Sequence, residues 1–269
     1  MNSNRKKQVG LLLIIVVIAA LLAFVQPSAA DDTVEPADLN DVQHVDRYRL
    51  RRWHPRVLSP RWPWYGRTYE EWAARWWQWA YSLPADDTHP LLADGVMDCS
   101  PGQKGKVWFL GGNLAGSEAN RECEVPAGKA LFFPIINIVC SEWTGDDDPL
   151  GCAESPGVPP GAEFIMNPLS ATIDGKPVRK LDRFLVVSQE TFDLGPLPDP
   201  AIWGAPPGEE TQGATRGYYL LLPPLSKGEH VIEFVGEIIV TDSELDPDDD
   251  LDYYYLSEIS YVLTVGKDK

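Results

Sequence analysis

The residues of this chain that could perform acid–base chemistry are few and far apart. Its 4 histidines are dispersed, and no G-x-S-x-G, H-E-x-x-H, G-x-G-x-x-G or P-loop motif occurs. His89, close to Asp86 and Asp87, could act as a general base, although a loop histidine before a proline is more often inert. Glu142 and Asp98 could form the carboxylate pair that glycoside hydrolysis requires. These three residues define an enzymatic alternative, an extracellular polymer hydrolase.

Metal binding is a second chemistry that the acidic segment 242–252 could support. Its aspartates alternate as the first ligands of a calcium loop do, at Asp246, Asp248, Asp250 and Asp252. The EF-hand pattern is incomplete, because Leu251 stands where that pattern needs glycine and Ser257 stands where it needs glutamate. The sequence favours a solvated hairpin tip. A calcium-dependent adhesion or assembly module is the alternative, and no other cofactor is predicted.

The cysteines indicate an oxidising compartment. They lie at Cys99, Cys123, Cys140 and Cys152, and an even number outside the cytoplasm is typical of two disulfides. Nearest-neighbour pairing, Cys99–Cys123 with Cys140–Cys152, is favoured among the three connectivities. A zinc site is the rival, but C-x-x-C spacing is missing and histidine is scarce.

Export is also predicted from the N-terminal segment 1–30. A basic "MNSNRKK" precedes an apolar run of 17 residues, and small residues at Ser28 and Ala30 suit cleavage after Ala30. An uncleaved membrane anchor is the alternative, because about 17–25 apolar residues can span a bilayer. Without the three basic residues of this segment, 20 Lys and Arg face 40 Asp and Glu. So acidic a surface disfavours nucleic acid and anionic lipid as partners.

The following segment, 31–67, is predicted to be an arm. Its first part is polar and acidic, and its second part, from position 46, is rich in arginine, tryptophan and proline. The prolines forbid a continuous helix, so we expect an extended arm whose arginine stems and rings pack against the acidic body. A basic docking arm for a polyanion is the functional alternative.

One helix is predicted directly after the arm, where "YEEWAARWWQWAYSLP" begins. Thr68 and Glu71 form a capping box, and Pro84 ends the helix. Trp72, Trp76, Trp79 and Leu83 recur at helical spacing and predict a buried stripe that caps the open face of a sheet. A stacking platform for sugar rings is the alternative.

The remainder of the chain predicts a mainly β domain over 68–267. Short apolar runs separated by turns favour strands at 106–112, 129–139, 170–178, 183–194, 217–225, 229–240 and 258–265. Because no helices alternate with these strands, we expect an antiparallel β-sandwich or jelly roll, stapled by disulfides, with the tryptophan-rich helix packed on it.

Several blocks in this order resemble a widespread group of secreted bacterial proteins. The blocks are "WWQW", "CSPGQKGKVWFLGG", "RECEVPAGKALFFPIIN", "GYYLLLPPLSKGEHVIEF" and "SYVLTV". The resemblance covers most of 68–265 and implies a secreted, disulfide-bonded, β-rich domain. It also supports pairing Cys99 with Cys123, which fall within shared blocks. The group has no established activity, so the resemblance carries over no catalytic residue.

A ligand site, if present, is expected where the helix meets the blocks around Cys99 and Cys123. The candidate binding residues there are Trp77, Gln78, Gln103, Arg121 and Lys129. Trp77 and Gln78 are expected to turn away from the centre of the buried stripe, and the other three are polar residues inside the shared blocks. The leading hypothesis is a secreted, non-enzymatic protein that binds a polysaccharide or another envelope component, or that associates structurally at the envelope.

Overall fold

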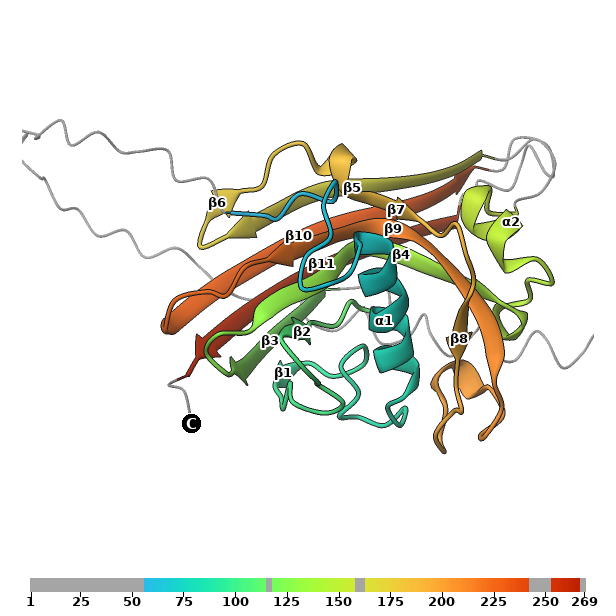
Figure 1. The fold of residues 1–269 in the computed structure, drawn as a ribbon, viewed down its shortest axis with the longest axis horizontal. Coiled ribbons are helices and arrows are strands. Elements are labelled where there is room, and N and C mark those ends of the chain that lie inside the picture. The colour runs from blue at the N-terminus through green and yellow to red at the C-terminus, as the bar shows by residue number, and fades with distance from the viewer. Residues whose placement is uncertain (1–55, 115–117, 158–162, 242–252, 267–269) are drawn as a thin grey trace, which may run out of the picture. The chain divides into compact units, whose positions relative to one another are not determined.

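The computed structural model describes residues 56–114, 118–157, 163–241 and 253–266 as two β-sheets packed face to face (Figure 1). This confirms the predicted mainly β, sandwich-like fold with a tryptophan-rich helix. The segment 1–30, most of the arm 31–67 and the acidic loop with Asp246, Asp248, Asp250 and Asp252 lie outside the described residues. Predictions on those segments remain predictions.

The helices and strands follow one another along the chain with short connections. The helical elements are α1 (Tyr69–Tyr81), α2 (Pro149–Glu154), η1 (Glu142–Thr144), η2 (Leu181–Phe184) and η3 (Ile202–Gly204). The strands are β1 (Gly95–Val96), β2 (Val107–Phe109), β3 (Glu118–Val125), β4 (Ala130–Ser141), β5 (Glu163–Ile173), β6 (Lys176–Pro177), β7 (Leu185–Val187), β8 (Phe192–Leu194), β9 (Thr211–Leu222), β10 (Gly228–Thr241) and β11 (Tyr253–Val265).

The two sheets differ in size and in pairing. The larger sheet has the order β1-β3-β11-β10-β5-β6, and the smaller has the order β2-β4-β9-β7, with β8 also paired to β9. The central pairs are antiparallel, whereas β3 lies parallel to β11 and β2 parallel to β4. Phe133 of β4 meets Phe234 of β10, with ring centroids 5.0 Å apart, and this contact helps to join the sheets.

Helix α1 begins where the sequence predicts. The Thr68 hydroxyl accepts a hydrogen bond from Glu71 N at 3.2 Å, and the Glu71 carboxylate accepts one from Thr68 N at 2.7 Å. This reciprocal pair confirms the capping box and satisfies two amide donors at the helix start. The helix then crosses β4 and β9 of the smaller sheet (Figure 1).

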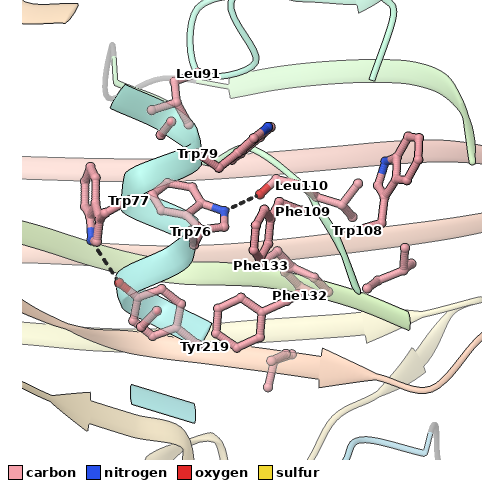
Figure 2. Close-up of a cluster of buried hydrophobic side chains, with 14 of the residues drawn as sticks. Trp76, Trp77, Trp79, Leu91, Trp108, Phe109, Leu110, Phe132, Phe133 and Tyr219 are labelled. Carbon is pink, nitrogen blue, oxygen red and sulfur yellow. Dashed lines mark hydrogen bonds between the residues drawn. The ribbon is translucent and has the colours of Figure 1, made fainter. Parts of the chain in front are cut away.

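The predicted tryptophan stripe is buried between α1 and the smaller sheet (Figure 2). Trp76 is 1% exposed and donates its indole N–H to Leu110 O at 2.8 Å, and Trp79 donates to Pro101 O at 2.9 Å. Trp72 is only half-buried. Both of these buried indoles thus find an acceptor for their N–H, as buried polar groups require. The cluster therefore forms part of the core and not a row of rings along an open groove.

Trp77, which the sequence places away from the centre of the stripe, is buried as well. Its side chain is 3% exposed, because α1 lies against β4, β7, β8 and β9 and so packs along more than one side. A helix contacted from several directions buries more than a single stripe.

The predicted strands lie in the right places along the chain, but several of their bounds differ from the prediction. The run 183–194 is broken into η2, β7 and β8, and β9 begins earlier than predicted, at Thr211. Strand β3 and helix α2 were not predicted. β3 alternates charged and buried residues, but its apolar members are only alanine, cysteine and valine, with Arg121 standing at a buried position. That composition gives a weak hydrophobic pattern.

The last part of the arm packs on the body. Leu58 is buried, its N–H donates to Leu221 O of β9, and its carbonyl accepts from the Tyr69 hydroxyl at 2.6 Å. Residues from 56 onward therefore belong to the β body, twelve positions before the predicted start at 68.

Both predicted disulfides are present. Cys99 bonds Cys123 across 24 residues, and Cys140 bonds Cys152 across 12 residues. The described chain contains no free cysteine. Such bridges indicate an oxidising environment. Among the described helices, none is long and apolar enough to cross a membrane.

Candidate functional site

A cavity of about 270 Å³ lies between α1, the segment 112–114, and the two sheets. Its walls are mainly apolar, with a few side chains that carry hydrogen-bonding groups. The apolar lining comes from Trp76, Trp77, Leu91, Leu114, Pro134, Ile135, Ile136, Ile138, Val139 and Ile238. The hydrogen-bonding lining comes from Asn113, Asn137, Thr144 and Ser257, and Tyr255 adds a ring with a hydroxyl. None of these lining residues carries a charge.

An irregularity in β4 shapes this cavity. The pairing of β4 with β9 shifts between Pro134 and Ile136, which marks a bulge. A proline inside a central strand requires such a bulge, because proline has no N–H for the ladder. One extra residue reverses the faces of all that follow. Ile136 therefore packs with the larger sheet, and Asn137 lies on the side of Tyr219, to whose hydroxyl it donates at 3.0 Å.

The larger sheet has a matching irregularity. The pairing of β10 with β5 shifts between Val235 and Gly236. A Cβ atom on Gly236 would lie 2.6 Å from the Cβ of Ile136 and 2.9 Å from Ile135 O. Only glycine allows this approach, so the two bulged strands meet here and the cavity extends beside the contact.

A buried hydrogen-bond network supports the wall of the cavity to which Trp77 and Asn137 belong. The Trp77 indole N–H donates to the Thr215 hydroxyl at 2.8 Å and to the Tyr219 hydroxyl at 3.1 Å. Thr215 in turn donates to Ile138 O at 2.7 Å. Burial raises the pKa of Tyr219 to about 12, so this hydroxyl stays protonated at neutral pH. The network fixes the Trp77 ring in place, and Figure 2 shows its bond to Tyr219.

Asn137 is the half-buried amide at the edge of this network. Its one hydrogen bond within the described residues goes from Nδ2 to the Tyr219 hydroxyl. A side-chain amide can donate two hydrogen bonds and accept two. Asn137 therefore retains capacity for a ligand inside the cavity.

Of the five predicted binding residues, the structure places only Trp77 at the cavity. Gln78 donates to Asp193 O at 3.0 Å. Gln103 forms two bonds with the backbone of Phe109, from its Nε2 to Phe109 O and from Phe109 N to its Oε1. Both glutamines therefore tie loops to neighbouring elements.

The two predicted cationic binding residues are also held internally. Lys129 donates to Gly105 O at 2.5 Å, and its Nζ lies 5.9 Å from the centre of the Trp108 ring. Arg121 is 2% exposed and donates to Ala93 O, to the carbonyls at 111 and 112, and to the Tyr261 hydroxyl. Since Gly112 lines the cavity, Arg121 positions one of its walls.

The predicted base, His89, is a buried structural residue. Its Nε2 lies 3.0 Å from Ala80 O, and its Nδ1 accepts from Leu91 N at 3.1 Å. This arrangement suits the neutral ring with the proton on Nε2. Burial lowers the pKa of His89, against the opposing effects of the Ala80 carbonyl and the Asp86 carboxylate. Both ring nitrogens are therefore occupied by backbone groups.

The structure does not bring together the two predicted catalytic carboxylates. Asp98 accepts a hydrogen bond from Ser100 N in a local turn. Glu142 instead lines an acidic hollow of about 600 Å³ with Asp147, Asp193 and Glu210. No cationic side chain is among the described residues that line this hollow. It concentrates negative charge, and Thr211 and Gln212 are the other polar residues of its lining.

The Cys140–Cys152 bridge lies beside another acidic group, Asp146. The two sulfur atoms and an Asp146 oxygen are within 4.8 Å of one another. Because the cysteines are bonded to each other, they provide no thiolate ligands for a metal. Asp146 accepts instead from the Thr144 hydroxyl, and Asp148 caps α2 at Gly151 N.

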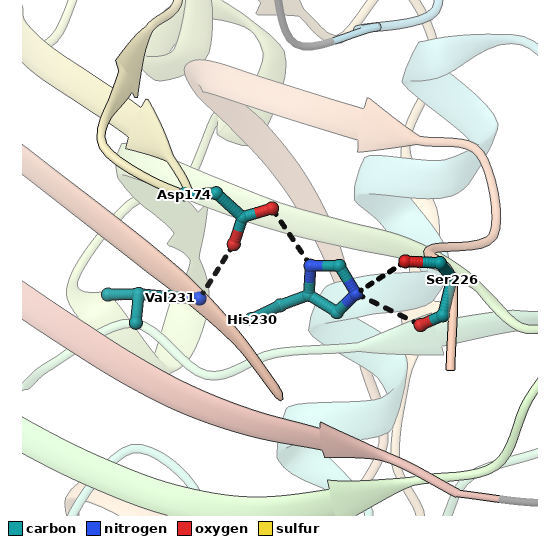
Figure 3. A network of polar contacts seen from close by, with 4 residues as sticks. All are labelled: Asp174, Ser226, His230 and Val231. Carbon is teal, nitrogen blue, oxygen red and sulfur yellow. Dashed lines mark hydrogen bonds and ion pairs between the residues drawn. The ribbon is translucent and has the colours of Figure 1, made fainter. Parts of the chain in front are cut away.

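A cluster that sequence reasoning missed joins two turns of the sheets (Figure 3). His230 Nδ1 lies 2.9 Å from Asp174 Oδ2, and its Nε2 lies 3.1 Å from Ser226 Oγ and 2.9 Å from Ser226 O. Val231 N donates to the other Asp174 oxygen. The residue types match a catalytic triad, and the distances are similar.

The chemistry of this cluster differs from that of a triad. A general base needs a free lone pair on Nε2 directed at the serine hydroxyl. Here Nε2 lies closer to the carbonyl oxygen of Ser226 than to its hydroxyl, 2.9 Å against 3.1 Å, so the ring is not aimed at the hydroxyl alone. Ser226 is also exposed and does not line the cavity. The cluster therefore acts as a clamp between the β5–β6 turn and the start of β10.

The cavity residues that sequence reasoning missed are uncharged members of strands. Asn137 lines the cavity and Thr215 and Tyr219 lie in the adjoining network; none belongs to a motif, and each could equally face solvent or the core in an isolated strand. The one usable signal was Pro134 within an otherwise continuous apolar run, which predicts a bulge at that point.

Comparison with known protein families, with curated proteins and with solved structures gives no match for this chain. The resemblance to secreted proteins with a WWQW helix therefore stays a prediction.

Proposed function

We propose that this protein is a secreted, non-enzymatic binding protein whose cavity takes a small, mainly apolar ligand. The cavity itself is the observation that carries this proposal. Ligand sites are typically concave and apolar, with a few polar groups that fix orientation. Trp77, Ile238 and Ile136 supply apolar walls, and Asn137 supplies a hydrogen-bonding group.

The size of the cavity limits the ligand class. An apolar cavity of about 150 Å³ holds one benzene ring. At about 270 Å³ this cavity has room for two fused rings or a short branched hydrocarbon. A charged ligand is disfavoured, because no lining residue could neutralise a charge removed from water. A neutral bicyclic compound with one hydroxyl fits both the volume and the Asn137 amide.

The described polar clusters favour binding over catalysis. His89 has both ring nitrogens bonded to the backbone, and the cluster of His230 with Asp174 and Ser226 lies outside the cavity lining. Among the described residues, the acidic hollow around Glu142 is therefore the remaining candidate site for the hydrolase alternative. Secretion rests on the export signal predicted for residues 1–30, and the two disulfides support it.

Isothermal titration with 2-naphthol, and with naphthalene as the partner without a hydroxyl, tests the proposal. We expect saturable binding of both, with 2-naphthol tighter by about tenfold because one good hydrogen bond is worth about 1–1.5 kcal/mol. Replacing Ser257 by leucine fills the cavity from β11 and should abolish binding. Ser260→Leu, on the opposite face of the same strand, is the matched control and should bind as the wild type does.

Two results would refute this function. The first is an absence of binding to either compound up to their solubility limits. The second is equal binding by the Ser257→Leu and Ser260→Leu proteins, since the compounds would then occupy another place. Circular dichroism must show that both variants retain the β fold.

A further inference from the structure

A second surface, independent of the cavity, lies at residues 59–67, which we name the aromatic turn. Trp62 is 66% exposed and Tyr65 is 39% exposed, and both belong to the few large apolar side chains that the described body presents to solvent. Isolated exposed rings are common. Here two exposed rings share one nine-residue turn.

The aromatic turn is rigidly anchored. Trp64 N donates to Arg67 O at 2.8 Å, and Arg67 N donates to Trp64 O at 3.2 Å, so the turn closes as a two-residue hairpin. The Trp64 indole donates to Ser59 O at 2.8 Å, and the Trp72 indole donates to Trp64 O at 2.9 Å. The exposed rings are thus presented on a backbone fixed to the core, which reduces the entropy lost on binding.

Tyr65 occupies a conformation that does not suit tyrosine. Its φ is +53°, followed by +82° at Gly66, which is the pattern of a type I′ turn. Asn-Gly is the preferred pair for this turn, and a bulky residue with positive φ is strained. The exposed Tyr65 ring compensates little of that strain through burial. Strained residues of this kind cluster at functional sites, where the strained conformation serves the binding of a ligand or partner.

The charge around the aromatic turn is opposite to that of the protein. The full sequence has a formal net charge of −17. Arg56 and Arg61 are nevertheless exposed, and neither forms an ion pair within the described part of the chain. Arg56 lies near Tyr65, since its charge opposes the rise in the pKa of Tyr65 that partial burial causes. Arg67 lies over the Trp72 ring, 5.6 Å from its centre.

Glu70 and Glu71, which follow the aromatic turn along the chain, form no ion pair with it within the described residues. Glu71 accepts from Thr68 N in the capping box, and Glu70 accepts from Gln189 N at 2.5 Å. Both carboxylates are thus held by backbone donors. The aromatic turn keeps cationic groups beside exposed rings.

We propose that the aromatic turn binds a polysaccharide that carries carboxylate groups. The apolar face of a sugar ring stacks on Trp62 and Tyr65, and the guanidinium groups of Arg56 and Arg61 pair with the carboxylates in a bidentate way. A bilayer is a poorer partner, because residues 59–67 contain no aliphatic side chain that could enter the acyl region.

Affinity electrophoresis and titration with polygalacturonate test this surface, with dextran as the neutral glycan. We expect the full chain to be retarded by polygalacturonate, less so at high salt, and only slightly by dextran. Trp62→Ala should weaken binding at least tenfold, and Arg61→Gln about threefold. Leu169→Ala, which removes another exposed apolar side chain, is the control and should bind as the wild type does.

Tyr65→Asn separates a binding role from a structural one. Asparagine suits the φ of +53°, so this variant should melt at the same temperature as the wild type or higher, yet bind polygalacturonate at least fivefold more weakly. Wild-type binding by Tyr65→Asn or by Trp62→Ala would overturn the proposal. So would a wild type that ignores polygalacturonate, including one that instead associates with vesicles containing phosphatidylglycerol.

Discussion

Replacing Arg121 by methionine is the perturbation that best tests how the described body holds its cavity. Methionine is unbranched and of similar length, so it fills most of the space that the arginine stem occupies. It lacks the guanidinium, which donates to Ala93 O at 2.9 Å, to Gly112 O at 2.8 Å, to Gly111 O at 3.2 Å and to the Tyr261 hydroxyl at 2.8 Å.

The magnitude follows from which acceptors lose their partner. Gly111 O keeps a hydrogen bond from the Tyr261 hydroxyl at 3.1 Å, so it remains satisfied. Ala93 O and Gly112 O lose the bonds that Arg121 makes to them. Each buried polar group without a partner costs about 1–3 kcal/mol, so the two together cost about 4 kcal/mol. For a domain of this size that is a fall in Tm of about 8–16 °C.

Calorimetric melting measures the effect, and Arg179→Met is the control. Arg179 is exposed on the segment after β6, so its replacement should leave the Tm unchanged within about 2 °C. The Arg121→Met protein should also bind 2-naphthol more weakly, because Gly112 lines the cavity and loses its anchor. A variant that melts with the wild type would refute the view that Arg121 is an internal donor to backbone carbonyls.

Three further substitutions test the buried polar groups and the bridges. Burial lowers the pKa of His89 below its ordinary 6.5, so below about pH 6.5 the unfolded chain binds more protons than the folded protein and the protein loses stability. Glutamine at position 89 mimics both ring hydrogen bonds without titrating, so His89→Gln should flatten a plot of Tm against pH between about 5 and 6.5. An unchanged slope would contradict this. Tyr219→Phe should lower the urea-derived free energy of unfolding by about 1–2 kcal/mol by removing the hydroxyl that Trp77 and Asn137 contact, while no change would show that the network is dispensable. Replacing both Cys99 and Cys123 by serine should cost about 3.5 kcal/mol by releasing a loop closed across 24 residues, and a wild-type midpoint in urea would exclude a stabilising bridge.

Features that depend on neighbouring residues could be predicted from the sequence. The start of α1 is set by Thr68 and Glu71, which are three positions apart, and the structure contains both of their hydrogen bonds. The nearest-neighbour disulfides likewise join segments that the chain itself brings close. Short apolar runs between turns locate most strands, because alternation and turn chemistry are local properties.

The lengths of the strands and their pairing partners were harder to predict from the sequence. The run 183–194 has strand composition throughout, yet its first residues form η2 and only short parts pair with β9. Pairing partners lie far away in sequence, so local propensity cannot decide where a ladder ends. The parallel pairing of β3 with β11 depends on the same long-range choice.

The sequence by itself determined a disulfide-bonded β body, a capped helix and the burial of Trp76 and Trp79, since spacing and capping chemistry are encoded within a few residues. Only the tertiary structure decided that Trp77 is also buried, that Arg121 is an internal donor and that Asn137 faces a cavity. Arg121 contacts groups up to 140 positions away, and Asn137 owes its orientation to one extra residue in β4. An arginine or an asparagine can lie at a surface or in an interior. Whether it is buried depends on the hydrogen-bond acceptors and cavity walls that the packed sheets place around it.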